Sequence, residues 1–246
     1  MDRMLYVAMT GAKETLRAQT VNNHNIANVS TTGFRADLAA FQSRAVDGSG
    51  YASRVYATNG TTGFNDQSGG MQTTGRDLDI AINGQGWIAV QGADGREAYT
   101  RAGNLQVDAN GQLMTATGQP VLGDGAPINI PPYTSILFAR DGSISIVAQG
   151  QTPDTTATVG RIKLVNPPDG QIERGSEGLF RMKDGSEAPP EASVQITSGV
   201  LESSNVNAAE AMVNMIELSR QFEMQVKAIR TAEENAASAT QLMRIG

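Results

Sequence analysis

The sequence of 246 residues contains no cysteine and only one histidine. The absence of cysteine excludes a disulfide framework, thiol catalysis, iron–sulfur clusters and cysteine-ligated zinc. A single histidine cannot supply a histidine-pair metal motif. The net charge of -6 argues against non-specific binding of nucleic acid, which needs a basic surface. No stretch approaches ~20 apolar residues, so no transmembrane segment is expected, and the first residues lack the apolar run of a cleavable signal peptide.

Residue patterns that carry catalysis are equally scarce. His24 lies in a helical segment without a candidate nucleophile nearby, so a surface or packed role is predicted for it. Asp77 and Asp79 would share one face of a strand and could bind a metal, although a solvated acidic pair is the simpler interpretation. Asp108 opens a calcium-loop-like run that lacks the glutamate at the twelfth position, which favours a hairpin turn. We therefore predict no enzyme activity, no catalytic residue, no metal and no cofactor.

Glycine and proline divide the chain into three zones. All nine prolines lie between Pro120 and Pro190, and 25 of the 27 glycines lie between residues 33 and 199. Residues 12–32 and 200–245 contain neither type. Because these residues mark turns and interrupt helices, the pattern predicts a helix, a turn-rich middle and a second helix.

The middle zone has the pattern of an antiparallel β domain. Asp-Gly begins at positions 47, 94, 124, 141, 169 and 184, and Asn-Gly begins at 59, 83 and 110. These dipeptides suit type I′ hairpin turns, in which both central residues have positive φ. Between them lie short apolar or β-branched runs that predict strands at residues 78–82, 87–91, 105–107, 136–138, 144–147 and 161–165. Trp87 is predicted to be a core residue of this domain.

The C-terminal zone repeats every seven residues. One row is entirely apolar and contains Ala208, Met215, Phe222, Ile229, Ala236 and Met243. A second row, three positions further on, is apolar at four of five positions. A repeat of this length favours a coiled-coil seam. About 40 helical residues extend roughly 60 Å, more than the roughly 45 Å diameter of a compact chain of this size, so the helix needs a partner along its length.

The N-terminal helix is the internal candidate for that partner. Leu5, Ala12 and Ile26 share one heptad row, and Met9 and Leu16 share the other. Four asparagines crowd its end, at positions 22, 23, 25 and 28. Two interpretations stay open, because a polar residue within a seam sets register and partner choice, whereas asparagine-rich sequence also ends helices.

These patterns predict an α+β fold with the N- and C-terminal helices pairing as a coiled-coil-like arm around a central all-β domain. The expected division is an N-terminal arm and turn at 1–40, a turn-rich connector at 41–79, the β domain at 80–198 and the C-terminal helix at 199–246. Such arms suit assembly, because neither helix can bury its apolar row alone.

Three blocks of sequence resemble the flagellar rod and hook protein family. The first runs from Ala27 to Arg35 (Ala-Asn-Val-Ser-Thr-Thr-Gly-Phe-Arg) and follows the helix that opens at Leu5. The second comprises residues 86–90, 99–105 and 111–118, and the third comprises residues 198–207. The two apolar replacements Trp87 and Leu105 stand where phenylalanine is common in that family.

This resemblance implies a structural protein of the basal-body rod, exported by the flagellar type III apparatus into the periplasm. Its implied partners are itself, other proximal and distal rod subunits and the rings around the rod, with no nucleic acid. A proximal subunit is the first interpretation and a distal subunit the second. A periplasmic polysaccharide-binding module and a peptidoglycan hydrolase built on Asp77 and Asp79 are the alternatives from other classes.

The residues that we expect to matter form three groups. The assembly seam is expected to use Leu5, Met9, Leu16, Ile26, Met215, Leu218, Phe222, Val226 and Ile229. The family motif and turn are expected to use Ala27, Asn28, Thr31, Thr32, Gly33, Phe34 and Arg35, with Gly33 supplying the permissive backbone. Trp87 completes the set as a core residue of the β domain.

Overall fold

The computed structural model describes residues 3–39, 41–45, 55–59, 63–152, 155–168, 170–175 and 177–245. The chain folds into two compact units, each built from segments that are not continuous in the sequence. The helical unit comprises residues 1–29, 36–65 and 206–246, and the β unit comprises residues 30–35 and 66–205. Among the described residues, neither helix carries the length of apolar sequence that crossing a bilayer requires.

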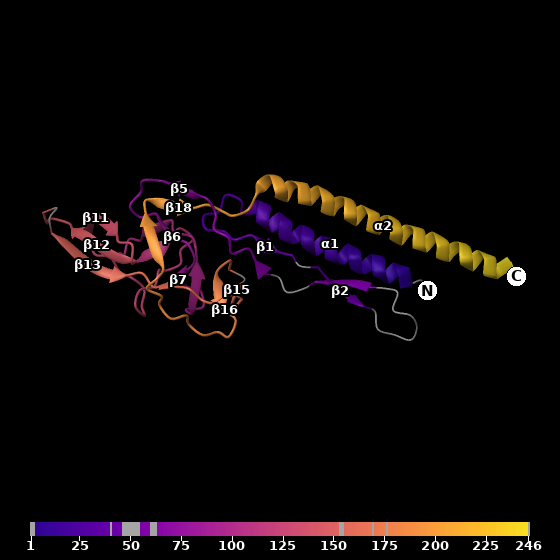
Figure 1. The fold of residues 1–246 in the computed structure, drawn as a ribbon, viewed down its shortest axis with the longest axis horizontal. Coiled ribbons are helices and arrows are strands. Elements are labelled where there is room, and N and C mark those ends of the chain that lie inside the picture. The colour runs from indigo at the N-terminus through magenta and orange to yellow at the C-terminus, as the bar shows by residue number, and fades with distance from the viewer. Residues whose placement is uncertain are drawn as a thin grey trace. The chain divides into compact units, whose positions relative to one another are not determined.

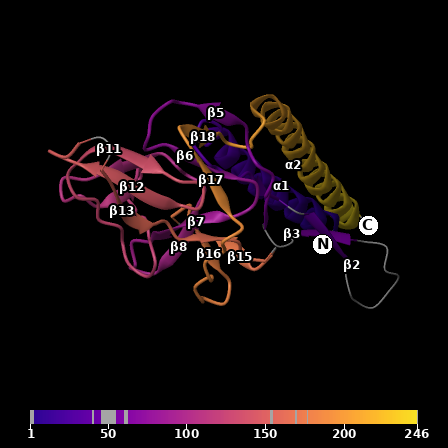
Figure 2. The ribbon, with the colours of Figure 1, turned by 60° about the vertical axis from the view of Figure 1, so that its left-hand side comes forward.

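The helical unit is built on two long helices that contact each other. Helix α1 spans Arg3–Ala27 and helix α2 spans Ala208–Ile245, and they run side by side in Figures 1 and 2. At 1.5 Å per residue these helices are about 37 and 57 Å long, so α2 extends beyond α1. Two antiparallel strand pairs complete the unit: β1 (Asp37–Leu38) with β4 (Gly63–Phe64), and β2 (Phe41–Ala45) with β3 (Val55–Asn59). Helix α1 also contacts β1 and β3.

The β unit consists of small antiparallel sheets. A five-stranded sheet has the order β14-β7-β8-β16-β15, and a three-stranded sheet has the order β11-β12-β13. Three strand pairs, β9 with β10, β6 with β17, and β5 with β18, complete it. The bounds are β5 Met71–Thr73, β6 Ile80–Asn83, β7 Trp87–Gln91, β8 Glu97–Thr100, β9 Leu105–Val107, β10 Leu113–Thr115, β11 Tyr133–Phe138, β12 Ser143–Ala148, β13 Thr156–Arg161, β14 Leu164–Val165, β15 Ile172–Arg174, β16 Phe180–Met182, β17 Gln195–Ser198 and β18 Val200–Glu202.

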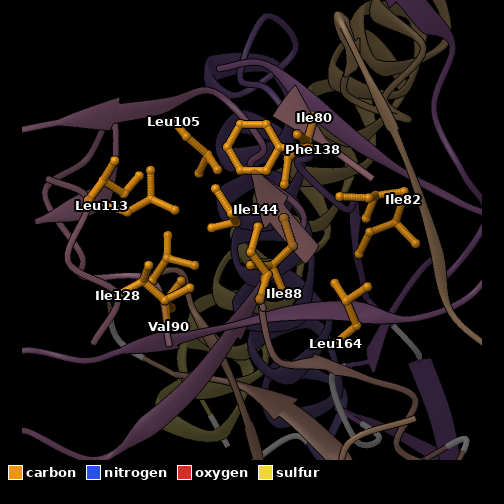
Figure 3. Close-up of a cluster of buried hydrophobic side chains, with 14 of the residues drawn as sticks. Ile80, Ile82, Ile88, Val90, Leu105, Leu113, Ile128, Phe138, Ile144 and Leu164 are labelled. Atoms are coloured by element: carbon orange, nitrogen blue, oxygen red, sulfur yellow. The ribbon is translucent and has the colours of Figure 1, made fainter. Parts of the chain in front are cut away.

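One aliphatic core holds these sheets together. Ile80, Ile88, Leu105, Leu113 and Ile144 are fully buried and come from five different strands (Figure 3). Their β-branched or aliphatic side chains suit a pleated surface with one buried face. The strands predicted at 87–91 and 105–107 have the observed bounds, and the other predicted strands overlap observed ones.

The hairpin turns differ from the predicted type. Among the described residues no residue other than glycine has positive φ, whereas a type I′ turn requires two central residues with positive φ. In the turn between β9 and β10, only Gly111 is left-handed, and the Asp108 carboxylate accepts the backbone N–H groups of Asn110 and Gln112 at 2.8 Å. The aspartate therefore caps the turn with its side chain and leaves the left-handed position to glycine. The dipeptides at 47 and 59 include residues outside the described ranges.

Candidate functional site

The inner face of α2 carries the predicted seven-residue repeat. Ala211 and Ala232 are buried, and the seam residues between them, Met215, Leu218, Phe222, Val226 and Ile229, are all partly buried. The Ala211 carbonyl oxygen accepts a hydrogen bond from the Asn22 side chain on α1 at 2.7 Å. These positions, spaced by three or four residues, mark the more buried side of α2.

The α1 side of this contact is lined by small residues. Ala8, Ala12, Thr15 and Ala18 are buried, and Gly11 lies so close to α2 that an added Cβ would be 3.0 Å from the Gln225 side chain. Since α1 also contacts β3, its buried side is shared between α2 and the β2–β3 hairpin. Small side chains allow two backbones to approach closely, and the bulk at this contact comes from α2.

The two predicted heptad rows of α1 differ in their burial. Met9 is 51% exposed and Leu16 is 47% exposed, while Leu5 and Ile26 of the other predicted row are partly buried and Ala12 of that row is buried. The row of Met9 and Leu16 is therefore about half exposed in the single chain, and its place in a seam stays a prediction.

An apolar surface remains uncovered on both helices. On α1 it comprises Tyr6, Met9 and Leu16, and on α2 it comprises Met212, Val213, Ile216 and Met224, all about half exposed or more. The α1 residues recur at three and seven positions, so they form one stripe along the helix. Half-exposed apolar side chains aligned along one side of a helix are candidates for contact with another chain.

The asparagines at the end of α1 have distinct structural roles. Asn22 is buried and fixes the position of α1 along α2 through its bond to Ala211. Asn25 pairs with the backbone of Asp37 twice, at 2.9 and 2.8 Å. Asn28 bonds back to the His24 carbonyl oxygen as the helix ends. The contact of Asn22 is of the kind expected for a polar seam residue, and that of Asn28 is of the kind expected at a helix end.

The motif turn continues from the helix into the β unit. Ala27 is the last residue of α1, and the Phe34 N–H donates to the Thr31 carbonyl oxygen, which places Thr32 and Gly33 inside a turn. Gly33 has φ +66 and lies against the Arg101 backbone, where an added Cβ would be 2.3 Å from the carbonyl carbon. Glycine is required here both for the left-handed backbone and for the close approach.

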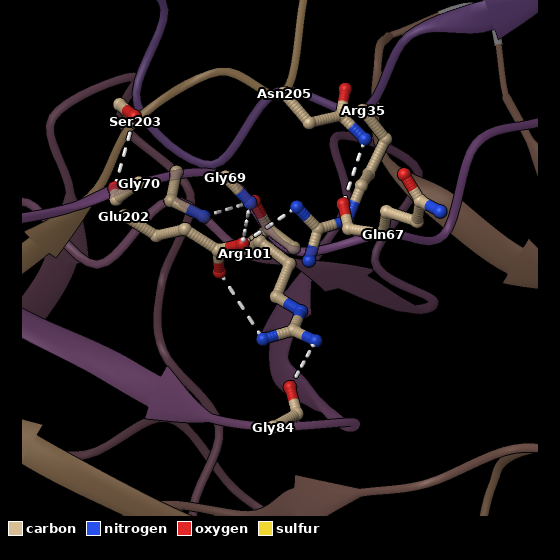
Figure 4. Close-up of polar contacts among 11 residues, drawn as sticks. Arg35, Gln67, Gly69, Gly70, Gly84, Arg101, Glu202, Ser203 and Asn205 are labelled. Atoms are coloured by element: carbon tan, nitrogen blue, oxygen red, sulfur yellow. Dashed lines mark hydrogen bonds and ion pairs between the residues drawn. The ribbon is translucent and has the colours of Figure 1, made fainter.

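Arg35, the last motif residue, belongs to a buried charged cluster around Glu202. Its Nη1 donates to Glu202 Oε1 at 2.6 Å, and Arg101 Nη1 donates to Glu202 Oε2 at 3.2 Å (Figure 4). All three side chains are essentially inaccessible to solvent. Burial lowers the pKa of Arg101 to about 10, against the attraction of Glu202, so its guanidinium stays charged at neutral pH.

An aromatic and cationic stack adjoins this cluster. Arg174 lies 4.7 Å from the ring centres of both Phe34 and Phe180, and its guanidinium donates to the Arg35 carbonyl oxygen. Phe180 packs on Trp87 with ring centres 4.4 Å apart, and Arg101 lies 5.6 Å from the Trp87 ring. Trp87 is 3% exposed. The motif residue Phe34 is thus anchored in the β unit by cation–π contact.

The acidic pair considered for a metal or a hydrolase is not assembled. Asp77 is exposed in a turn, whereas Asp79 is buried and accepts a hydrogen bond from Thr74 Oγ1 at 2.8 Å. The expectation that both share one strand face is wrong, because the strand begins only at Ile80. His24 lies 2.7 Å from the Asp37 carboxylate, and the described residues hold no cluster of three or more potential metal ligands.

Comparison with known proteins places these features in one family. Residues 5–35 match the flagella basal body rod protein family, residues 81–151 match the flagellar hook protein FlgE/F/G D1 domain, and residues 197–242 match the flagellar basal body rod FlgEFG protein C-terminal family. FlgF of Salmonella typhimurium strain LT2 is 45% identical over 249 residues, which cover 99% of each chain. This chain belongs to the flagellar basal-body rod protein family. Membership assigns it to the flagellar basal body as a structural subunit of the rod.

Within the rod family, similarity to FlgF exceeds similarity to FlgG. FlgF of Escherichia coli K12 is 43% identical over 99% of both chains. FlgG of Buchnera aphidicola subsp. Acyrthosiphon pisum is 36% identical over 97% of this chain and 98% of the relative. The FlgF type is therefore favoured.

Sequence reasoning missed the central residue of the charged cluster. Glu202 and Arg101 were both part of the quoted family blocks, but no spacing rule brings residues 35, 101 and 202 together. The one signal was a single glutamate at the end of an otherwise apolar strand, Val200–Glu202, shortly before the helix that begins at Ala208.

Proposed function

We propose that this rod protein polymerises into the helical shaft of the basal body and transmits motor torque through packed helices. Head-to-tail contacts between different surfaces of identical or related subunits build open filaments of this kind. The observation that carries the proposal is the uncovered apolar stripe Tyr6, Met9 and Leu16 on a helix whose other side is already packed. An apolar stripe exposed in the single chain gains burial on assembly.

The predicted seam then divides into two layers. Met215, Leu218, Phe222, Val226 and Ile229 form the layer within the subunit, where α1 and α2 pair in a coiled-coil-like manner. Met9 and Leu16 belong to the layer between subunits, together with the exposed apolar residues of α2. Leu5 and Ile26 contribute at the two ends of the inner layer.

The proposed partners follow from a place in the rod. They are further copies of this chain, other proximal and distal rod subunits and the rings that surround the rod. The proposed route is export through the flagellar type III apparatus into the periplasm. A chain without cysteine can make that journey unfolded without forming incorrect disulfides. The proposed organisation of the chain is a helical arm at 1–40, a connector at 41–79, a β domain at 80–198 and a C-terminal helix at 199–246.

The assembly layer can be tested with a double substitution, Met9→Glu and Leu16→Glu. Both side chains are already half exposed, so the single chain is expected to keep its helix content and its Trp87 fluorescence. Burial of two carboxylates between subunits would cost several kcal/mol, so motility of a strain lacking the native gene should not be restored. The amount of exported protein in the medium is measured in parallel, so that an export defect is recognised.

Leu137→Glu is the matched control, since Leu137 is an apolar residue that is 64% exposed on β11 in the β unit. This control should restore motility as the unmodified chain does. Normal motility of the double variant would contradict the assignment of the α1 stripe to assembly. Failure of the unmodified chain to restore motility would contradict the rod function itself.

A further inference from the structure

The chain passes between its two units at four points, after residues 29, 35, 65 and 205. The ends that lie on the β side belong to three segments: 30–35, 66–70 and 201–205. Any force that passes along the chain from one unit to the other enters the β unit through these segments. The contacts that join these three segments to one another therefore decide how such a force is divided among them.

The Glu202 carboxylate and backbone bind two of these segments directly (Figure 4). Its Oε1 accepts from Arg35 Nη1 at 2.6 Å and from the Gly69 N–H at 2.9 Å. Its backbone carbonyl oxygen accepts the Gly33 N–H at 2.8 Å. One residue of the third segment thus holds both of the others.

Neighbouring hydrogen bonds join the same segments. The Asn205 N–H donates to the Phe34 carbonyl oxygen at 3.2 Å, and the Asn205 side chain donates to the Gln67 carbonyl oxygen at 2.8 Å. The Ser203 N–H donates to the Gly70 carbonyl oxygen at 2.8 Å. These bonds are made by Ser203 and Asn205, which follow Glu202 in the chain. The β-side ends of all four crossings therefore belong to one hydrogen-bonded group.

The stability of this hydrogen-bonded group depends on the negative charge of Glu202. Two buried guanidinium groups, Arg35 and Arg101, both pair with the Glu202 carboxylate, and Arg101 also donates to the Gly84 carbonyl oxygen at 2.6 Å. Asp66 attracts Arg101 more weakly than Glu202 does. Within the described residues, Arg35 Nη2 and the Nε atoms of both arginines have no hydrogen-bond partner. Removing the carboxylate would leave two buried cations without their principal counter-charge, a strongly unfavourable state.

We propose that Glu202 is a positioning residue that ties the four chain crossings into one joint, so that load between the helical and β units is shared among them. The inference rests on the proposed torque-transmitting function. Without the joint, each crossing strand would respond to force separately. The β unit would still fold around its own aliphatic core, which lies in other strands.

The test is hydrogen exchange by mass spectrometry on the full chain carrying Glu202→Gln. The expected result is at least tenfold faster exchange of the amides in residues 30–35 and 66–70, with β7 and β8 unchanged. Glu97→Gln is the matched control, because Glu97 is also a buried glutamate of the β unit, paired with Lys163 at 2.7 Å. It should leave exchange in the crossing segments at the wild-type rate.

A double variant, Arg35→Met with Glu202→Gln, covers the case in which Glu202→Gln fails to fold. It removes one of the two buried cations together with the Glu202 carboxylate and so restores the net charge of the native cluster, but it also removes the joint, so residues 66–70 should still exchange at least tenfold faster. Wild-type rates in the crossing segments of either folded variant would overturn the joint.

Swimming in a viscous medium, which raises motor load, then separates the two proposals. The inference expects Glu97→Gln to restore motility to a strain lacking the native gene and Glu202→Gln to fail at high load. Full motility of Glu202→Gln at high load would overturn the load-sharing role. Failure of the unmodified chain would instead count against the rod function, while the exchange result would still decide whether the joint exists.

Discussion

Gly33→Ala tests whether the motif turn requires glycine for its backbone, for its packing or for both. Gly33 has φ +66, a region that costs alanine about 1–2 kcal/mol. The added Cβ would be 2.3 Å from the Arg101 carbonyl carbon and 2.4 Å from its oxygen, so the backbone must shift by about 1 Å to reach ordinary contact. That shift would stretch the hydrogen bond from the Gly33 N–H to Glu202, which contributes about 1 kcal/mol.

Part of this cost is offset, because alanine restricts the unfolded chain by about 0.4–1 kcal/mol relative to glycine. With overpacking of about 1–3 kcal/mol included, the net loss of unfolding free energy should be about 3 kcal/mol. Gly75→Ala is the matched control: its φ is +72, but nothing lies within 4 Å of an added Cβ. Its expected loss is about 1 kcal/mol at most, since only the backbone term applies.

The assay is urea unfolding followed by the fluorescence of Trp87, the only tryptophan in the chain, which is buried in the β unit. With a slope of about 2–3 kcal/mol per molar urea, Gly33→Ala should lower the midpoint by about 1 M. Gly75→Ala should lower it by less than half as much. Equal losses for the two variants would refute the steric argument and leave only the backbone term.

Three further outcomes are expected. Phe222→Asp should abolish motility and separate α1 from α2, because a carboxylate in the inner seam costs at least ~2 kcal/mol. The unfolding midpoint followed by Trp87 fluorescence should stay unchanged, since Trp87 lies in the β unit. The control Phe222→Leu should be tolerated. A chain with Gly11→Cys and Gln225→Cys should be joined by a short thiol crosslinker, because a Cβ at position 11 would lie 3.0 Å from the end of the Gln225 side chain and no native cysteine competes. Adding Asn22→Leu should reduce the crosslinking yield by loosening the register between α1 and α2, and an unchanged yield would contradict that role. Burial raises the pKa of Tyr99 far above its ordinary value, so its phenol should ionise last in a spectrophotometric titration. Because the folded state then binds the proton more tightly, unfolding free energy should fall as pH rises above about 10, and Tyr99→Phe should remove that slope.

Local rules were sufficient for the outline of the fold. The seven-residue repeat from Ala208 onward predicted α2 and the side of it that is partly buried, because that period is a property of one helix alone. Short apolar runs between glycine-containing turns predicted β7 and β9 with their observed bounds. The turn type was wrong, because the aspartate side chains cap these turns and a single left-handed glycine is sufficient.

Pairing partners could not be predicted in the same way. On α1, the predicted rows contained Ala12, which is buried, but also Met9 and Leu16, which are about half exposed, and they did not contain the buried residues Ala8 and Ala18. A sequence pattern records which side chains are apolar, but the distance between two backbones decides which of them fit. The exposed row became informative only once the helices were placed together.

The sequence by itself determined the two helices and several of the strands, that the chain has no cysteine and a single histidine, and which motifs tie it to the rod family. These properties depend on residue type and on separations of a few positions. The tertiary structure alone decided that Arg35, Arg101 and Glu202 meet in one buried cluster. The reason is that a carboxylate can be buried only where cations reach it, and that meeting is set by how distant segments fold onto one another rather than by any local spacing.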